Sequence, residues 1–223
     1  DRYHGSLIEN EVVLGYIKLV PWFTLVISGL IFWGMTIGNW TDVYRTLFEV
    51  CIYYSAFAIV ISFFDKFILK FKIFVYLLIS LIFVVLTIDI SCINLLLISQ
   101  GELSSEMMVV CVYIAIGLFL IFSFVYAWHY LPKNQGKIWA INQWETYEKL
   151  LKNKKLMKFL KSLPVVAFVL IVIAVLSGHE NYIECVFGVL NGILDLFAFP
   201  ALVVDAIYGA IYISGNPSYD ELE

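Results

Sequence analysis

The sequence predicts an all-α integral membrane protein with about six transmembrane helices, on composition and on the length of its apolar runs. Of its 223 residues, 62% are hydrophobic and 14% are charged, whereas a soluble domain has about 45–50% apolar and about 25% charged residues. One core cannot hide such an excess, because much of a soluble domain's surface stays in contact with water. The composition therefore excludes a soluble enzyme, a nucleic-acid binder (14 basic against 18 acidic residues) and a disordered chain.

Apolar runs long enough to cross about 30 Å of hydrocarbon predict helices, because a transmembrane β-strand would instead alternate over about ten residues. The six predicted spans are Tyr16–Ile37, Val43–Phe64, Phe71–Ile98, Met107–Leu131, Pro164–Ser177 and Tyr182–Ser214. They divide the chain into five parts. These are an N-terminal cytoplasmic arm (1–15), a four-helix transmembrane segment (16–131), a cytoplasmic polybasic loop (132–163), C-terminal transmembrane helices (164–214) and an acidic tail (215–223).

The distribution of basic residues predicts the orientation. Six crossings put every Lys and Arg except Arg45 on the same side of the membrane, and basic residues are enriched in cytoplasmic loops. Both termini of this multi-pass protein should therefore be cytoplasmic.

The last predicted span is long and contains Pro200. A proline removes one backbone hydrogen bond and clashes with the preceding turn of a helix, so we expect a break or a kink there. A re-entrant second half, the alternative to a kinked crossing, would place the C-terminus outside.

Polar residues inside this span give the first functional hypothesis. Glu184, Asn191 and Asp195 recur at intervals of seven and four residues, so they share one face of a helix, and Asp205 follows the proline. Charged groups at this depth are costly and often mark an ion or proton pathway. The ladder therefore resembles a cation or proton path, although polar contacts between helices explain the same pattern.

Two glycines on the same helix predict close packing. Gly188 and Gly192 form a GxxxG pair, which lets a second helix approach the backbone. Together with Pro200, they are the expected packing residues of the last span.

Two more carboxylates lie in or near the half of the membrane that holds Glu184. Glu49 begins the second span, and Asp89 lies within the third, far in sequence from any basic residue. We include both in the candidate transport path, with the alternative that Glu49 faces lipid headgroups. Asp89 needs a partner from another helix.

The polybasic loop has a separate predicted role. Trp139 and Trp144 precede six lysines interleaved with apolar residues, at positions Lys149, Lys152, Lys154, Lys155, Lys158 and Lys161. Lysines of this kind are attracted to anionic lipid, and aromatic residues favour the headgroup level. The pattern predicts an amphipathic helix lying on the cytoplasmic leaflet. The lysines would equally hold the loop inside as a topology signal.

Three classes of function follow from these features. The favoured one is a channel or transporter component that moves a cation, a proton or a cationic solute through the acidic path. The alternative is a non-transporting interaction protein, such as a toxin-immunity protein, a phage-defence protein or an accessory subunit. An intramembrane enzyme is third, because no catalytic motif is present. The expected partners are anionic inner-leaflet lipids and further membrane subunits, either copies of this chain or other proteins, with no nucleic acid, metal or cofactor.

Overall fold

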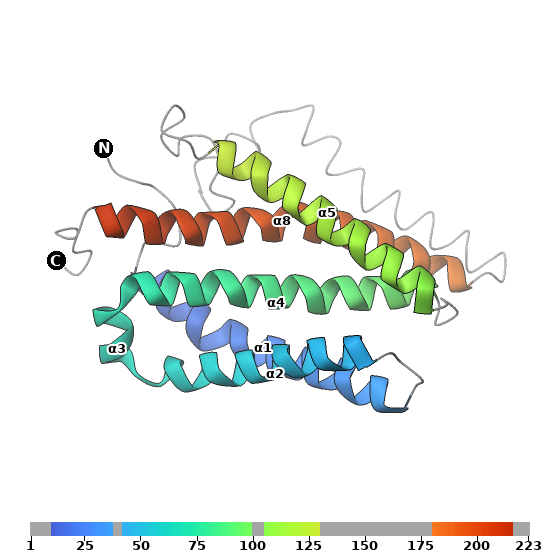
Figure 1. The fold of residues 1–223 in the computed structure, drawn as a ribbon, viewed down its shortest axis with the longest axis horizontal. Coiled ribbons are helices and arrows are strands. Elements are labelled where there is room, and N and C mark those ends of the chain that lie inside the picture. The colour runs from blue at the N-terminus through green and yellow to red at the C-terminus, as the bar shows by residue number, and fades with distance from the viewer. Residues whose placement is uncertain (1–9, 38–41, 100–104, 130–179, 216–223) are drawn as a thin grey trace.

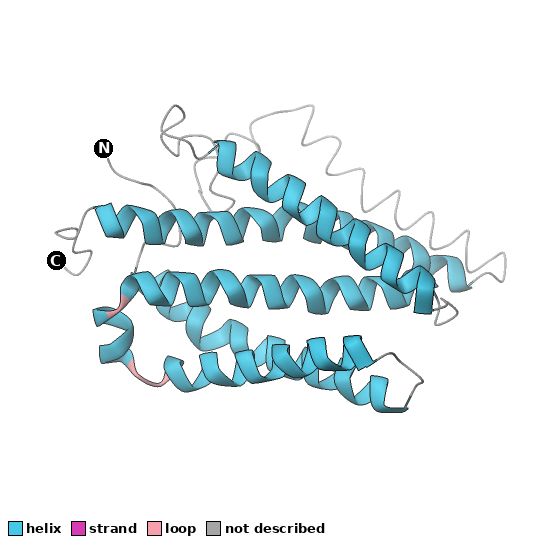
Figure 2. Cartoon of the chain, viewed as in Figure 1, coloured by secondary structure: helices cyan, strands magenta, loops and turns pink. Residues whose placement is uncertain are grey.

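The computed structural model describes residues 10–37, 42–99, 105–129 and 180–215, and every regular element in these ranges is a helix (Figures 1 and 2). The helices are α1 (Asn10–Ile37), α2 (Asp42–Ser62), α3 (Asp65–Lys70), α4 (Lys72–Ser99), α5 (Ser105–His129) and α8 (Glu180–Gly215).

Five of these helices, α1, α2, α4, α5 and α8, are long and apolar enough to cross a membrane. Their bounds lie within two residues of the predicted spans, except that α1 begins six residues earlier, at Asn10. Unbroken apolar stretches are the strongest local signal for such helices. The sixth predicted span, Pro164–Ser177, and the predicted polybasic helix lie outside the described residues.

Helix α4 is the centre of the bundle. It packs most extensively against α8 on one side and against α1 and α2 on the other, and α5 lies mainly against α8 (Figure 1). The buried core follows this arrangement: α4 contributes Tyr76, Ile79 and Ile82, which pack with Val203 and Ala206 of α8. Among the described helices, α4 is therefore covered by α8 on one side and by α1 and α2 on the other.

Helix α8 passes through Pro200 as a single helix, so of the break or kink expected at this residue, the break is absent. A continuous helix also excludes a re-entrant turn there. The proline lacks one N–H, but it lies among packed residues, less than 2% exposed. Neighbouring helices supply contacts that let a transmembrane helix tolerate such a residue.

The spacer between the second and third predicted spans contains the short helix α3, which was not predicted. Its first residue, Asp65, pairs with Lys18 of α1, with Nζ 2.9 Å from Oδ1. Both side chains are about half exposed, so solvent weakens their attraction. The pair ties α3 to the end of the bundle where α1 begins.

We expect Lys18→Gln to change the free energy of unfolding by less than about 1 kcal/mol, because exposed ion pairs stabilise proteins only slightly. Thermal unfolding in detergent at low and high salt would measure the change. A larger loss of stability would mean that the ion pair holds α3 in place.

Candidate functional site

Two carboxylates lie at the interfaces between α4 and its neighbours, on different sides of α4. Asp89 is on α4 itself and faces α1, whereas Asp195 is on α8 and contacts Asn94 of α4. Asp89 and Asn94 are five residues apart, which places them about 140° apart around the helix. The candidate site therefore has two parts, separated by the central helix.

Asp89 is fully buried between α4 and α1, with 0% of its surface exposed. The Ser28 hydroxyl lies 2.7 Å from one carboxyl oxygen and 2.9 Å from the other and donates to them. One turn earlier on α1, the Thr24 hydroxyl lies 2.8 Å from the Ser55 hydroxyl of α2. A line of hydroxyl groups thus continues from Asp89 along the interface between α1 and α2.

The second part of the site is a triangle of two amides and a carboxylate between α4 and α8. Asn94 donates from Nδ2 to Oδ2 of Asp195 at 2.6 Å. Asn191 donates from Nδ2 to Oδ1 of Asn94 at 2.8 Å and to the same Asp195 oxygen at 3.2 Å. Asp195 is buried, whereas Asn191 is exposed. The recorded hydrogen bonds to Asp195 all reach Oδ2, so Oδ1 faces no donor among the described residues.

Glycines allow this triangle to form. The Cβ of an alanine at Gly188 would lie 2.9 Å from the Asn94 carbonyl oxygen and 2.9 Å from Cγ1 of Ile98. At Gly192 it would lie 3.7 Å from the Asn94 amide nitrogen. Both glycines therefore face α4, and the absent side chain at Gly188 lets the two backbones approach closely.

Helix α5 contacts α8 on both sides of the proline. Tyr126 donates a 2.9 Å hydrogen bond to the Phe197 carbonyl, three residues before Pro200. Tyr208, eight residues after the proline, donates a 3.1 Å hydrogen bond to the Ala127 carbonyl of α5. These reciprocal bonds hold the two helices together across the position where α8 lacks a backbone donor.

The other candidate path residues do not join these two groups. Asp205 is 4% exposed and lies among the buried residues of α8, ten residues and about 15 Å along the helix from Asp195. Glu49 is exposed on α2, where its nearest recorded partner is the Tyr53 hydroxyl at 3.4 Å. Glu184 belongs to α8, but its side chain is outside the described set, as are the lysines of the polybasic loop.

Sequence reasoning missed the two residues that contact the carboxylates, Ser28 and Asn94. Asn94 lies five residues after Asp89 in an otherwise apolar helix, so its burial cost was a usable signal. Ser28 carried no such signal, because a serine in a transmembrane helix can satisfy its hydroxyl on its own backbone.

The chemistry of the site is that of carboxylates without cationic neighbours. Among the described residues, neither Asp89 nor Asp195 forms an ion pair, and no group of three His, Cys, Asp or Glu side chains could hold a metal ion. A buried carboxyl with neutral donors must carry a proton or meet a cation, because an isolated charge at low dielectric is very costly. The arrangement therefore suits the reversible binding of a proton or a monovalent cation.

No family model, curated protein or solved structure matches the chain.

Proposed function

We propose that the chain is a multi-pass membrane protein with both termini on the cytoplasmic side. The five long apolar helices support the membrane placement. The concentration of basic residues on one side of six predicted crossings supports the orientation. The polybasic loop would then rest against anionic lipid of the inner leaflet.

We further propose that the protein is a component of a channel or transporter for a proton, a cation or a cationic solute. The observation that carries this proposal is the environment of Asp195, a carboxyl group near the middle of α8 whose neighbours are amides. Its second oxygen is available to a proton or a cation, and the exposed Asn191 lies at the edge of the triangle. A proton or a cation could bind to Oδ1 and leave it without breaking the hydrogen bonds to Oδ2.

Asp89 would serve as a second, enclosed site on the same pathway. Its contact with Ser28 leaves no exposed surface, so exchange there needs a small ion and a movement of α1 against α4. Glu184 and Glu49 would act at the outer end of the path, where they can attract cations toward the buried groups. Asp205, which is itself buried, would continue the path along α8 toward the cytoplasmic side.

Asp195→Asn is expected to abolish cation or proton flux while the fold and the oligomeric state persist. Asparagine retains the shape and can still accept a hydrogen bond from Asn94 through Oδ1, but it cannot carry a negative charge. The measurement is flux of protons, Na⁺ and K⁺ into liposomes containing the purified protein.

Asp65→Asn is the matched control, because it makes the same chemical change at an exposed position on α3. Unchanged flux in Asp195→Asn would contradict the transport proposal. An equal loss in both variants would show that the effect is not specific to the triangle.

A non-transporting interaction protein is the second candidate, favoured by the close contact of α4 and α8. Amide–carboxylate bonds beside a glycine also suit a permanent helix joint. Helix α5 adds an unusually exposed apolar face, with Tyr113, Phe124 and Trp128 each more than 60% exposed. Copies of this chain or another membrane subunit could pack there. This candidate gains support if the wild type shows no flux and Asp195→Asn alters only assembly.

A further inference from the structure

The hydrogen bonds among Asn94, Asn191 and Asp195 lead toward the carboxyl group. An ionised carboxylate only accepts hydrogen bonds, so the two amides that lie 2.6 Å and 3.2 Å from Oδ2 of Asp195 present their NH₂ ends to it. This fixes the orientation of Asn94, whose Oδ1 then accepts from Nδ2 of Asn191 at 2.8 Å. The triangle therefore aims N–H donors from two residues at one carboxyl oxygen.

A metal cation needs a cage of oxygen atoms, because it must exchange its hydration shell for several carbonyl or carboxylate oxygens when it enters a buried site. Oδ2 of Asp195 faces two NH₂ groups, whose partial positive charge repels a cation, and Oδ1 of Asn94 already accepts a hydrogen bond. Among the described residues, Oδ1 of Asp195 and Oδ1 of Asn191 are the side-chain oxygens of the triangle without a recorded donor. Two oxygens are too few to replace a hydration shell.

The packing of α8 on α4 leaves no space for a hydrated ion on the side of the glycines. The Cβ of an alanine at Gly188 would lie 2.9 Å from the Asn94 carbonyl oxygen, so the two backbones are in contact. At Gly192, one turn before Asp195, it would lie 3.7 Å from the Asn94 amide nitrogen. Asp195 itself is 8% exposed. A proton needs neither space nor further ligands, because it forms a covalent bond with one oxygen.

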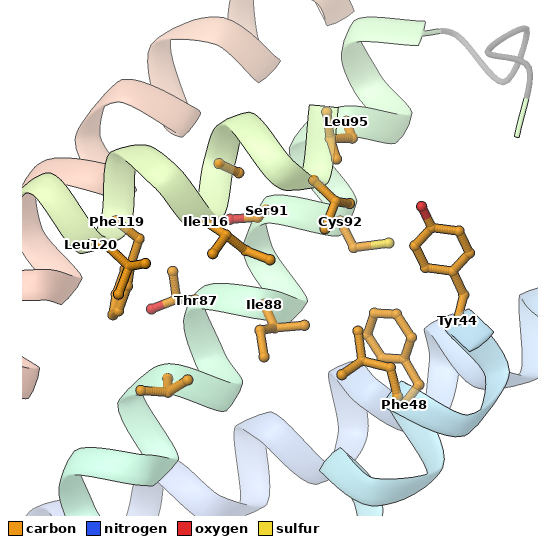
Figure 3. Close-up of a pocket in the computed structure, with 14 residues that line it drawn as sticks. Tyr44, Phe48, Thr87, Ile88, Ser91, Cys92, Leu95, Ile116, Phe119 and Leu120 are labelled. Atoms are coloured by element: carbon orange, nitrogen blue, oxygen red, sulfur yellow. The ribbon is translucent and has the colours of Figure 1, made fainter. Parts of the chain in front are cut away.

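The titratable groups on the helices around Asp195 are directed elsewhere. On α4, Asp89 faces α1, and Cys92 lines an apolar pocket between α2 and α5 (Figure 3). On α5, the Tyr126 hydroxyl donates to a backbone carbonyl of α8. On α8 itself, Asp205 is ten residues away. Within the described ranges, no charged group therefore competes with a proton for the Asp195 carboxylate or replaces it.

We infer that the species bound at Asp195 is a proton and not a metal cation. The proton comes from water and forms an O–H bond at Oδ1, while Oδ2 keeps its hydrogen bonds to the two amides. Release returns the proton to water and restores the carboxylate. The inference rests on the proposed transport function and names its substrate, but proton binding at Asp195 can also be measured without transport.

The first experiment measures flux into liposomes that contain the full chain. A pH-sensitive dye inside the liposomes reports proton entry, and radioactive sodium and rubidium report cation entry. Proton entry should fall to the level of protein-free liposomes in Asp195→Asn and persist in the exposed control, Asp65→Asn. Entry of sodium or rubidium that Asp195→Asn abolishes would overturn the proton assignment and leave the transport proposal standing.

Infrared spectroscopy of the full chain in vesicles measures the same carboxyl group without any need for flux. A protonated carboxyl has a C=O stretching band that an ionised one lacks, so the band grows as the pH is lowered. We expect one titrating component of this band to be lost in Asp195→Asn and retained in Asp89→Asn. Asp89→Asn is the matched control, because it removes another buried carboxyl.

The midpoint of this titration in the wild type distinguishes a proton from a cation, even if Asp195→Asn does not fold. A cation that binds the carboxylate competes with the proton and moves the midpoint to lower pH. We expect the same midpoint in sodium, potassium and choline buffers. A lower midpoint in sodium or potassium buffer, or a band without a titrating component, would overturn the inference. A titration that ignores these cations, together with an absence of any flux, would uphold the proton site and contradict the transport proposal.

Discussion

Gly188→Ala is expected to destabilise the folded bundle by about 1–3 kcal/mol, the usual cost of overpacking. The added Cβ would lie 2.9 Å from the Asn94 carbonyl oxygen and 3.1 Å from Cβ of Leu97. The first is a backbone atom of α4, so no change of side-chain rotamer relieves the clash, and the helices must separate. That separation also stretches the short Asn94–Asp195 hydrogen bond, which spans the same interface.

Gly117→Ala is the matched control, because a Cβ at Gly117 of α5 meets nothing within 4 Å. Alanine favours a helix more than glycine does, so this variant should be unchanged or more stable by up to about 1 kcal/mol. Unfolding of both variants in graded denaturing detergent, followed by circular dichroism, gives the comparison. Equal stability of Gly188→Ala and the wild type would mean that α4 and α8 do not touch at this glycine.

Ser28→Ala should lower stability by about 1–3 kcal/mol, because it leaves the Asp89 carboxyl buried without its hydroxyl donor. Asp89 has no exposed surface, so water cannot replace the lost bond. Adding Asp89→Val to the same chain removes the stranded polar group, since replacing both partners by apolar residues is close to neutral. We therefore expect the double variant to be more stable than Ser28→Ala alone.

The same denaturing titration measures this double-mutant cycle. A double variant that loses the sum of the two single effects would show that Ser28 and Asp89 do not interact. Ser55→Ala is a suitable control on α2, because the Ser55 hydroxyl bonds to Thr24 and to the Cys51 carbonyl, whereas Ser28 donates to Asp89. Its effect should not depend on the residue at position 89.

The helices could be predicted from the sequence because each is an unbroken apolar run, and this local property fixes its bounds to within a few residues. Helix α3 could not, since six residues make too few turns to show a period. The sequence left open whether α8 breaks or only kinks at Pro200, and the structure has a continuous helix there. Helix α5 is hydrogen-bonded to α8 on both sides of the proline, and a local rule about proline does not include such contacts.

The partners of the carboxylates mark the limit of sequence reasoning. The stripe of Asn191 and Asp195 was visible because both lie on one helix, whereas Asn94 is about a hundred residues earlier and Ser28 resembles many other serines. The contacts of Asp89 with Ser28 and of Asp195 with Asn94 depend on which helices pack together, and no single helix determines that.

The central place of α4 has a consequence for how the protein is made. When α4 emerges from the ribosome, α1 is already present, so Asp89 can find Ser28 at once. Asn94 must wait until α8 has been synthesised, about a hundred residues later. Until then, the helix with the highest mean hydropathy among those described holds an amide without this partner. A chain truncated before α8 would leave the Asn94 amide without this carboxylate, so the cost of burying it would stay uncompensated.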